Sequence, residues 1–286
     1  MDRRAQIQRA RRFRALHDRS RVLLLPNAWD AGSARVFASL GFDAIATTSG
    51  GVAWSLGYPD GEQVPLDEVI AAIRRMVRVT SLPVSVDFEG GYGASPEAVA
   101  ANVRMVIDAG VAGINLEDGI RHERLRDIDD AARRIAAARK AAREAGVPIV
   151  INARVDTWIV GGDAGETELI GETLRRARAY LEAGADCIYP IALARPEVIA
   201  RLCAAIEAPI NIGVRVGLPD LAELGYLGVA RVSTATRLAT VALSAAHEAA
   251  ERLQSSGRFD GLDAALGYES MQRLFVDPED TVGGTR

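Results

Sequence analysis

Two acidic side chains end a short apolar run near the middle of the chain, and their spacing suits a metal ion. The run starts at Val84, and Asp87 and Glu89 lie two residues apart, so both carboxylates share a face if the run is a strand. Burying two like charges without partners is costly, and a hard cation such as Mg²⁺, which prefers oxygen ligands, removes that cost. The alternative is that both acids are solvated loop residues or helix N-caps.

The next apolar run adds a third carboxylate. In it Asn115 and Glu117 share one face, while Asp118 points to the other. If the two runs are neighbouring strands of a barrel, Asp87, Glu89 and Glu117 converge. Magnesium sites typically use one or two carboxylates and keep several waters. These three residues therefore form the predicted metal site, for Mg²⁺ or for Mn²⁺ in its place.

A positive charge follows at the end of the run after that. Asn152, Arg154 and Asp156 occupy alternate positions there, so on a strand they share a face. An arginine fork at a strand end can stabilise an anionic substrate or a developing enolate. The alternative is an arginine that only neutralises the acids beside it.

Two earlier segments contribute candidate binding groups. The glycine-rich turn from Thr47 to Gly51 offers backbone N–H groups without side-chain obstruction, which suits a carboxylate or a phosphonate. Its simpler interpretation is a turn that follows a strand. Asp60 stands in a Pro-Asp-Gly sequence, which by itself indicates only a β-turn.

Short apolar runs alternate with helical segments from Val22 onward, and this pattern is typical of βαβ units and a parallel sheet. The predicted strands are Val22–Asn27, Ala44–Ser49, Val84–Glu89, Gly113–Asp118, Ile149–Val155, Cys187–Ile191, Ile210–Val214 and Arg231–Thr236. The predicted helices include Leu66–Val79, Pro96–Ala109, Ile128–Ala145, Thr167–Ala183 and Pro196–Ile206.

The alternation predicts an α/β fold, a (β/α)8 barrel of the TIM type, whose active site lies at the C-terminal ends of the strands. A doubly wound sheet is the alternative, but its G-x-G-x-x-G fingerprint is absent from the first strand–helix turn. No linker divides the chain. We expect a solvated, arginine-rich N-terminal helix in residues 1–20 and one barrel domain in residues 21–286, with a further short helix at Phe259–Phe275.

Composition excludes several classes of protein. The 286 residues carry a formal net charge of −4, and no apolar run is long enough to cross a membrane or to direct export. The net negative charge argues against a nucleic-acid-binding protein. Because no export or membrane segment is found, we expect a cytoplasmic protein. The one lysine, Lys140, lies in a predicted helix, which disfavours Schiff-base chemistry. Three histidines and two cysteines argue against a multi-histidine metal site and a disulfide framework.

Together these segments resemble the isocitrate lyase/phosphoenolpyruvate mutase superfamily along nearly the whole chain. No single motif is specific, but six of them occur in the family's order and at the matching barrel positions. They are PNAWDAGSAR (26–35), TTSGGVA (47–53), LGYPDGE (56–62), VDFEGGYG (86–93), INLEDG (114–119) and INARVD (151–156).

The resemblance implies a (β/α)8 barrel whose C-terminal helix is exchanged between subunits, usually in a dimer of dimers. It implies Mg²⁺ held by Asp87, with Glu89 and Glu117 acting mostly through water. It further implies that the substrate is a small carboxylate or phosphonate, cleaved or formed through a pyruvate-type enolate. The residues expected around that substrate are Ser49, Gly50, Gly51 and Asn115 for binding, Arg154 beside the oxyanion, and Asp60, Arg154 and Glu117 for catalysis.

Three departures from the family pattern bear on the reaction. The metal motif usually has two aspartates, whereas the second position here is Glu89. The segment Ile120–Arg126 has no cysteine, although the lyases use a loop cysteine there as general acid; His122 and Glu123 could transfer protons instead, or the loop is merely solvated. Ile191 stands where those lyases carry a glutamate.

The leading hypothesis is a cytoplasmic, Mg²⁺-dependent lyase that cleaves a C–C bond of a small 2-oxo or 2-hydroxy acid. The first alternative is a phosphonate mutase or phosphonopyruvate hydrolase, which acts on a P–C bond. The second is a barrel that binds a carboxylate without turnover. We expect a homo-oligomer, and we expect no nucleic-acid or membrane partner.

Overall fold

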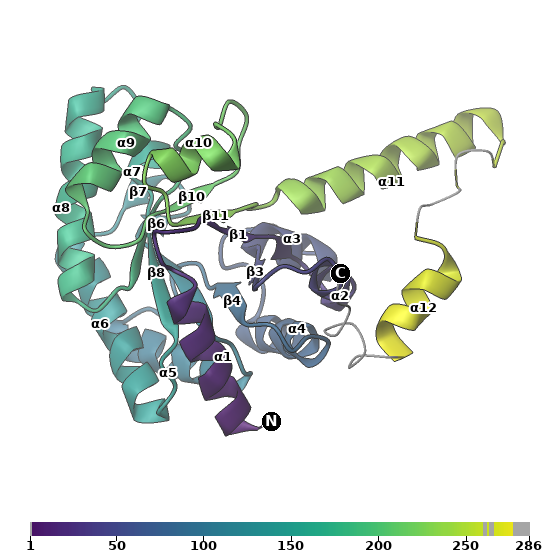
Figure 1. Ribbon diagram of the computed structural model, residues 1–286, viewed down its shortest axis with the longest axis horizontal. Helices are drawn as coiled ribbons and strands as arrows, with labels where there is room; N and C mark the ends of the chain where they lie inside the picture. Colours follow the sequence, from purple (N-terminus) through teal and green to yellow (C-terminus); the bar gives the residue numbers. More distant parts are fainter. Residues whose placement is uncertain (1, 260–261, 263–265, 277–286) are drawn as a thin grey trace.

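Parallel strands close into a barrel in this computed structural model, which describes residues 2–259, 262 and 266–276 (Figure 1). β1 and β2 are two halves of the first strand, separated by Pro26, which has no N–H to donate to a neighbouring strand. The barrel strands are β1 (Leu23–Leu25), β2 (Asn27–Ala28), β3 (Ile45–Thr47), β4 (Val84–Asp87), β5 (Gly113–Glu117), β8 (Val150–Val155), β9 (Cys187–Pro190), β10 (Asn211–Gly213) and β11 (Arg231–Ser233).

The strand order is that of a closed (β/α)8 barrel. The strands pair in the order β2-β3-β4-β5-β8-β9 and β1-β11-β10, and all these pairs are parallel. A bridge between Ile188 and Ile210 joins β9 to β10 and closes the circle. Every predicted strand is present, and the predicted α/β barrel is confirmed.

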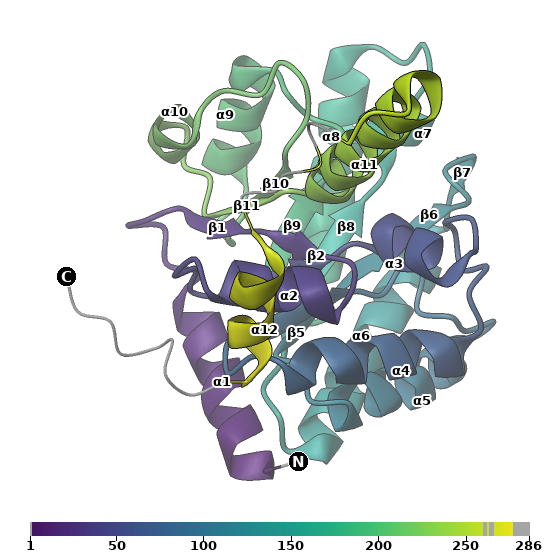
Figure 2. The ribbon, with the colours of Figure 1, turned by 90° about the vertical axis from the view of Figure 1, so that its right-hand side faces the viewer.

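Helices surround the strands, as Figures 1 and 2 show. Apolar faces at helical spacing pack on the barrel, and a side-chain N-cap begins several of these helices, as Ser95 does for α5. The helices are α1 (Arg3–Ala15), α2 (Ala31–Ala38), α3 (Ser49–Leu56), α4 (Leu66–Arg78), α5 (Pro96–Asp108), α6 (Ile128–Ala145), α7 (Thr157–Val160), α8 (Glu166–Glu182), α9 (Pro196–Ala205), α10 (Leu221–Tyr226), α11 (Arg237–Ser256) and α12 (Tyr268–Val276).

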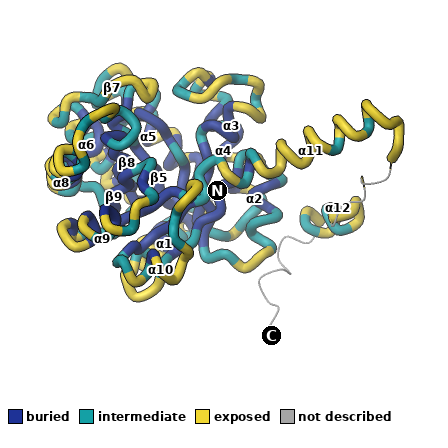
Figure 3. Tube along the Cα trace, turned by 90° about the horizontal axis from the view of Figure 1, so that it is seen from above, coloured by how far each residue is buried: buried dark blue, intermediate teal, exposed yellow. Residues whose placement is uncertain are grey.

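One face of the N-terminal helix α1 packs on the rest of the molecule, as in an amphipathic helix. Phe13 is completely buried, and the Gln6 amide donates to the Ile107 and Val111 carbonyls at 2.7 and 3.1 Å. Figure 3 shows the buried strands at the centre and the exposed residues on the outer helices. Arg4, Arg11, Arg12 and Arg14 are exposed, whereas Arg3 and Arg9 are half-buried.

Two segments differ from their predicted conformation. Residues 49–51 do not form a turn; they begin helix α3, because the Thr48 side chain accepts from the Gly51 N–H and caps it. The segment after β5 is a small antiparallel hairpin of β6 (Gly119–Ile120) and β7 (Arg124–Leu125).

The C-terminal helices extend away from the barrel. α11 projects outward in Figure 1 and exposes Val241 and Leu243. The predicted tail helix corresponds to α12, whose Leu274 carbonyl accepts from Arg35 of α2; residues 260–261 and 263–265 of the predicted span lie outside the described residues. None of the described helices is both long enough and apolar enough to cross a membrane.

Candidate active site

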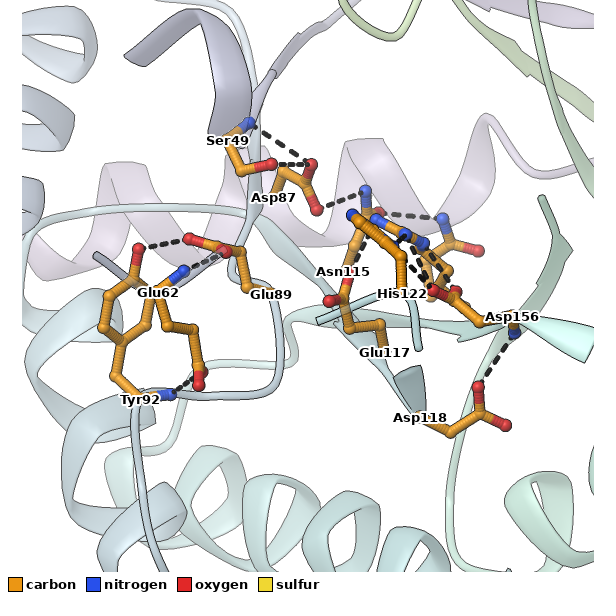
Figure 4. A network of polar contacts seen from close by, with 12 residues as sticks. Ser49, Glu62, Asp87, Glu89, Tyr92, Asn115, Glu117, Asp118, His122 and Asp156 are labelled. Atoms are coloured by element: carbon orange, nitrogen blue, oxygen red, sulfur yellow. Dashed lines mark hydrogen bonds and ion pairs between the residues drawn. The ribbon is translucent and has the colours of Figure 1, made fainter. Parts of the chain in front are cut away.

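Asp87 ends β4 at the mouth of the barrel, where three donors contact its carboxylate (Figure 4). The Ser49 hydroxyl and N–H donate to Oδ2 at 3.0 and 3.3 Å, and the Asn115 amide donates to Oδ1 at 3.4 Å. These long, neutral hydrogen bonds hold the carboxylate in place, yet none of them neutralises its charge. The Asp87 carboxylate is therefore available to a bound cation.

The side chain of Asn115 is oriented from below by a buried polar layer. Its Oδ1 accepts from the Asn152 amide at 2.8 Å and from Arg231 Nη2 at 3.3 Å, which turns its amide NH₂ toward Asp87. Arg231 is fully buried and stacks over the Phe13 ring at 5.7 Å. These contacts inside the barrel therefore orient Asn115 so that its NH₂ group, and not its oxygen, faces Asp87.

Arg154, on β8, is the buried cation of the site. It donates from Nε and Nη2 to the two oxygens of Asp156, both at 2.8 Å, and its Nη1 lies 2.5 Å from Glu117 Oε2. Burial opposes its charge, but these two carboxylates outweigh burial and raise the pKa of Arg154, so the guanidinium stays protonated. The bonds to Asp156 agree with the strand face that these two residues were predicted to share, and register places Glu117 of β5 directly beside Arg154.

One guanidinium cannot balance the carboxylates gathered around it. Burial raises the pKa of Glu117 well above its usual value, and the charges of Asp156 and Asp87 add to that shift. Burial and the charge of Asp87 likewise raise the pKa of Asp60, whose side chain lies beside Gly50 at the start of α3. The site therefore gathers more acidic than basic side chains, and either protons or a bound cation can relieve the repulsion between them.

Glu89 does not point to Asp87 as the alternation predicted. Its backbone is left-handed (φ 47°), and its carboxylate accepts from the Glu62 N–H at 2.5 Å and from the Tyr92 hydroxyl. Glu62 in turn accepts from the Tyr92 N–H at 2.6 Å, and burial raises the pKa of Glu89 to about 7. Glu89 thus ties the loop that carries Asp60 to the loop after β4, because the chain leaves the β conformation immediately after Asp87.

Within the part of the chain that the structure describes, no three His, Cys, Asp or Glu side chains form a ready-made metal cage. The carboxylates nonetheless fit a cation that keeps several waters, as Mg²⁺ does. Asp87 is held without an opposite charge, and the buried Glu117 Oε2 has no hydrogen bond of good geometry despite its short distance to Arg154. The excess negative charge at the mouth is what such an ion would balance.

Asp118 faces away from the site, as the strand alternation predicted. Its carboxylate accepts from the Tyr180 hydroxyl at 2.6 Å, from Arg176 at 3.0 Å and from the Asp156 N–H at 2.8 Å. Through that last bond the outer network positions the backbone of Asp156, and so the partner of Arg154.

We expect that Gly119→Ala disrupts the Arg154–Asp156 pair. A methyl group on Gly119 would overlap the Asp156 carboxylate, with its carbon only 2.9 Å from Cγ. Overpacking of this kind costs about 1–3 kcal/mol. Urea unfolding should show that loss, whereas Gly171→Ala, which lies inside α8 and meets no atom within 4 Å, should be at least as stable as wild type, because alanine favours the helix more than glycine does. Equal stability of both variants would contradict the packing described here.

Some residues of the site carry no clear signal in the sequence. Tyr189 of β9 lies next to Arg154 in register, is buried, and approaches so closely to Gly213 that only glycine fits there; burial raises its pKa to about 12. His122, for which proton transfer and a solvated loop position were both considered above, lies over the Arg154–Asp156 pair. The Tyr-Pro strand end and the lone loop histidine were visible, but only the fold shows where they point.

Comparison with known proteins identifies the family. The family model for phosphoenolpyruvate phosphomutase matches residues 13–254. The chain belongs to the isocitrate lyase/phosphoenolpyruvate mutase superfamily. It is therefore an enzyme of this superfamily, as the resemblance implied.

Relatives in the superfamily cover the whole barrel. The uncharacterized protein Rv1998c of Mycobacterium tuberculosis is 37% identical over 96% of this chain and 99% of its own length. The 2-methylisocitrate lyase of Escherichia coli is 31% identical over 91% of this chain and 88% of its own. The crystal structure of 2,3-dimethylmalate lyase superimposes with a TM-score of 0.81 at 28% identity, covering 93% of this chain and 91% of that one.

Proposed function

We propose that this superfamily enzyme is a Mg²⁺-dependent lyase that cleaves a C–C bond of a small 2-oxo or 2-hydroxy acid and forms a pyruvate-type enolate. The observation that carries the proposal is the juxtaposition of Arg154 with uncompensated carboxylates at the barrel mouth. Such a site has places both for a cation and for an oxyanion that develops during the reaction.

Asp87 would hold Mg²⁺, with Glu117 and Glu89 acting through water. When bound, Mg²⁺ supplies positive charge beside the developing enolate oxygen, and Mn²⁺ could replace it. Glu89 would act from a greater distance than an aspartate, because its carboxylate is already held by Tyr92 and Glu62.

The substrate carboxylate would bind at the start of α3. Ser49, Gly50 and Gly51 form the first turn of that helix, whose N-terminus favours an anion. The Ser49 N–H donates to Asp87 and the Gly51 N–H to Thr48, so the Gly50 N–H is the donor of this turn that a substrate carboxylate would meet. Because Gly50 has no side chain, Asp60 can approach it closely. Asn115 completes the binding surface beside Asp87.

Arg154 would stabilise the enolate oxygen, and Asp60 would remove or return the proton of the reacting acid. A buried carboxyl with a raised pKa takes up a proton more readily than an exposed aspartate does. The pairing of Arg154 with Asp156 keeps the guanidinium charged and oriented. Glu117 lies on the other side of Arg154 and would help to direct it.

The second candidate is P–C bond chemistry, a phosphonate mutase or phosphonopyruvate hydrolase, which the matching phosphomutase model favours. The third is a barrel that binds a carboxylate without turnover. Product analysis by NMR separates the three: a carbon fragment plus pyruvate supports the lyase, whereas inorganic phosphate or an isomerised phosphonate supports the second candidate. Stabilisation by a 2-oxo acid without any product supports the third.

The carboxylate cluster predicts how Mg²⁺ and pH act together on stability. Because the pKa of Glu89 is raised to about 7 from 4.5, the folded protein holds a proton that the unfolded chain releases, so stability falls as pH rises through that window. Mg²⁺ should offset the repulsion, and we expect it to raise the Tm more at about pH 8 than at about pH 5.5. Thermal scans with Mg²⁺ or EDTA measure this, with Glu89→Gln as the variant whose pH slope is flatter. If Mg²⁺ raised the Tm by the same amount at both pH values, the assignment of the metal site to these carboxylates would be contradicted.

We also propose a cytoplasmic homo-oligomer, a dimer of dimers in which the C-terminal helices pass between subunits. The exposed apolar residues of α11 and of the segment after it support this, since a second copy would cover them. They are Val241, Leu243, Phe259, Leu262, Leu266, Tyr268 and Val276.

A further inference from the structure

The turn between β6 and β7 carries a histidine, His122, that lies next to Asp156 (Figure 4). The Nδ1 atom of His122 lies 3.4 Å from Asp156 Oδ2 and 3.3 Å from Arg154 Nη2. Its side chain is 43% exposed, so one edge of the ring meets the buried ion pair and the other remains open. Among the described residues, Nε2 has no hydrogen-bond partner.

The backbone that positions the His122 ring is strained. Arg121 and His122 are consecutive non-glycine residues in the left-handed region, with φ of 53° and 57°. Such residues cost free energy and persist only where the surroundings hold them. The Arg126 N–H, which donates to the Asp118 carbonyl at 2.8 Å, and the β6–β7 pairing hold this turn.

The open side of the ring faces a polar cavity of about 280 Å³ between the loops after β3, β4 and β5. This volume is close to the lower limit for small-molecule sites, about 300 Å³. The cavity also reaches Glu117, so His122 lines the same cavity as the carboxylate beside Arg154. Its charged lining residues are Glu62, Glu89, Glu117, Arg121, His122 and Arg126.

The charges around the ring favour a protonated imidazole. The hydrogen bond with Asp156 raises the pKa of His122, and this effect is larger than the opposing effects of burial and of Arg154. Asp60 adds a smaller effect in the same direction. Asp156 itself remains ionised, since Arg154 and His122 outweigh its burial and lower its pKa.

We propose that His122 is a catalytic residue that transfers the proton to and from C3 of the pyruvate-type enolate, with Asp156 orienting its ring. In the protonation step the Nε2–H bond breaks and a C–H bond forms at C3. The enolate electron pair moves from the C2–C3 double bond into that C–H bond, while the C2 carbonyl re-forms. The neutral imidazole regains a proton from water through the open face of the cavity. This inference rests on the proposed function.

Exchange of the pyruvate methyl protons in D₂O tests this step without knowledge of the full substrate. Proton NMR of pyruvate with Mg²⁺ and the protein should show exchange by wild type. His122→Gln keeps a polar side chain but cannot carry the proton, so its exchange rate should be lower than that of wild type by a factor of about 100 or more. Added imidazole should restore exchange to His122→Ala. His247→Gln is the matched control, because His247 lies exposed on α11 and pairs only with Glu251.

A second measurement separates proton transfer from a structural role. Titration with Mn²⁺ and with pyruvate should give the same affinities for wild type and His122→Gln. If His122→Gln exchanges the methyl protons as fast as wild type, His122 does not transfer the proton. The same conclusion follows if its exchange is slow only because it binds Mn²⁺ or pyruvate less tightly. Either result overturns the role of His122 and leaves the proposed function standing. Binding of pyruvate by wild type without exchange would overturn the role of His122 as well. If wild type binds no pyruvate with Mg²⁺, the proposed function fails and this inference fails with it.

Discussion

Asp87→Ala is expected to abolish turnover while leaving the fold intact. In the proposed mechanism Asp87 is the direct ligand of Mg²⁺, and removing that ion removes several kcal/mol of charge stabilisation, which reduces kcat/KM by about 10³-fold or more. The carboxylate makes only long, neutral hydrogen bonds, so its loss should change the Tm by no more than about 3 °C. Steady-state kinetics and thermal unfolding measure the two effects.

Asp163→Ala provides the matched control, because Asp163 is exposed in the loop before α8 and, among the described residues, its side chain makes no hydrogen bond or ion pair with the site. That variant should keep full activity and full Mn²⁺ affinity. Asp87→Ala should lose both. Activity near that of wild type in Asp87→Ala would refute the metal assignment, and a large drop in Tm would show that Asp87 supports the fold instead.

Arg154→Lys is expected to damage both stability and catalysis. A lysine cannot reproduce the bidentate bond to Asp156 while also reaching Glu117, so one buried carboxylate loses its partner. Breaking a buried ion pair costs about 3–5 kcal/mol. Loss of the donors beside the enolate oxygen should lower kcat by about 10²–10³-fold. Urea unfolding and single-turnover kinetics separate the two losses.

Arg176→Lys tests whether any buried arginine would behave in this way. Arg176 is also buried and also pairs with carboxylates, Asp118 and Glu172, but it lies on the outer face of the strands. We expect its replacement to reduce stability and to leave kcat within about threefold of wild type. The reason is that its contacts with Asp118 and Glu172 lie outside the ring of strands and do not touch the reacting atoms. A loss of kcat as large as that of Arg154→Lys would remove the special role of Arg154.

The fold was predictable because each strand is a short apolar run bounded by helix-ending glycines. Ile128–Ala145 was predicted with the bounds that the structure has, since Asp127 caps its start and Gly146 ends it in a left-handed conformation. Strand alternation also predicted the shared face of Arg154 and Asp156 and the outward direction of Asp118. These inferences depend only on period and register, which the sequence expresses directly.

The same alternation failed where the backbone leaves its strand. Glu89 follows β4 in a left-handed conformation and turns to Tyr92, although a two-residue spacing predicted that it would lie beside Asp87. Ser49 to Gly51 form a helix start because of the Thr48 cap, a feature hidden by the adjacent glycines. His122 and Tyr189 needed the closed barrel, because their neighbours come from other strands.

Pyruvate release tests the central claim most directly. Oxaloacetate, methylisocitrate, 2,3-dimethylmalate and phosphonopyruvate would each be incubated with the protein, with Mg²⁺ or with EDTA, and pyruvate followed through reduction by lactate dehydrogenase. We predict pyruvate from one of the carbon acids, with Mg²⁺ only, and none from Asp87→Ala. Pyruvate formed equally with EDTA or by Asp87→Ala, or none from any compound while an acid and Mg²⁺ still raise the Tm, would contradict a metal-dependent lyase.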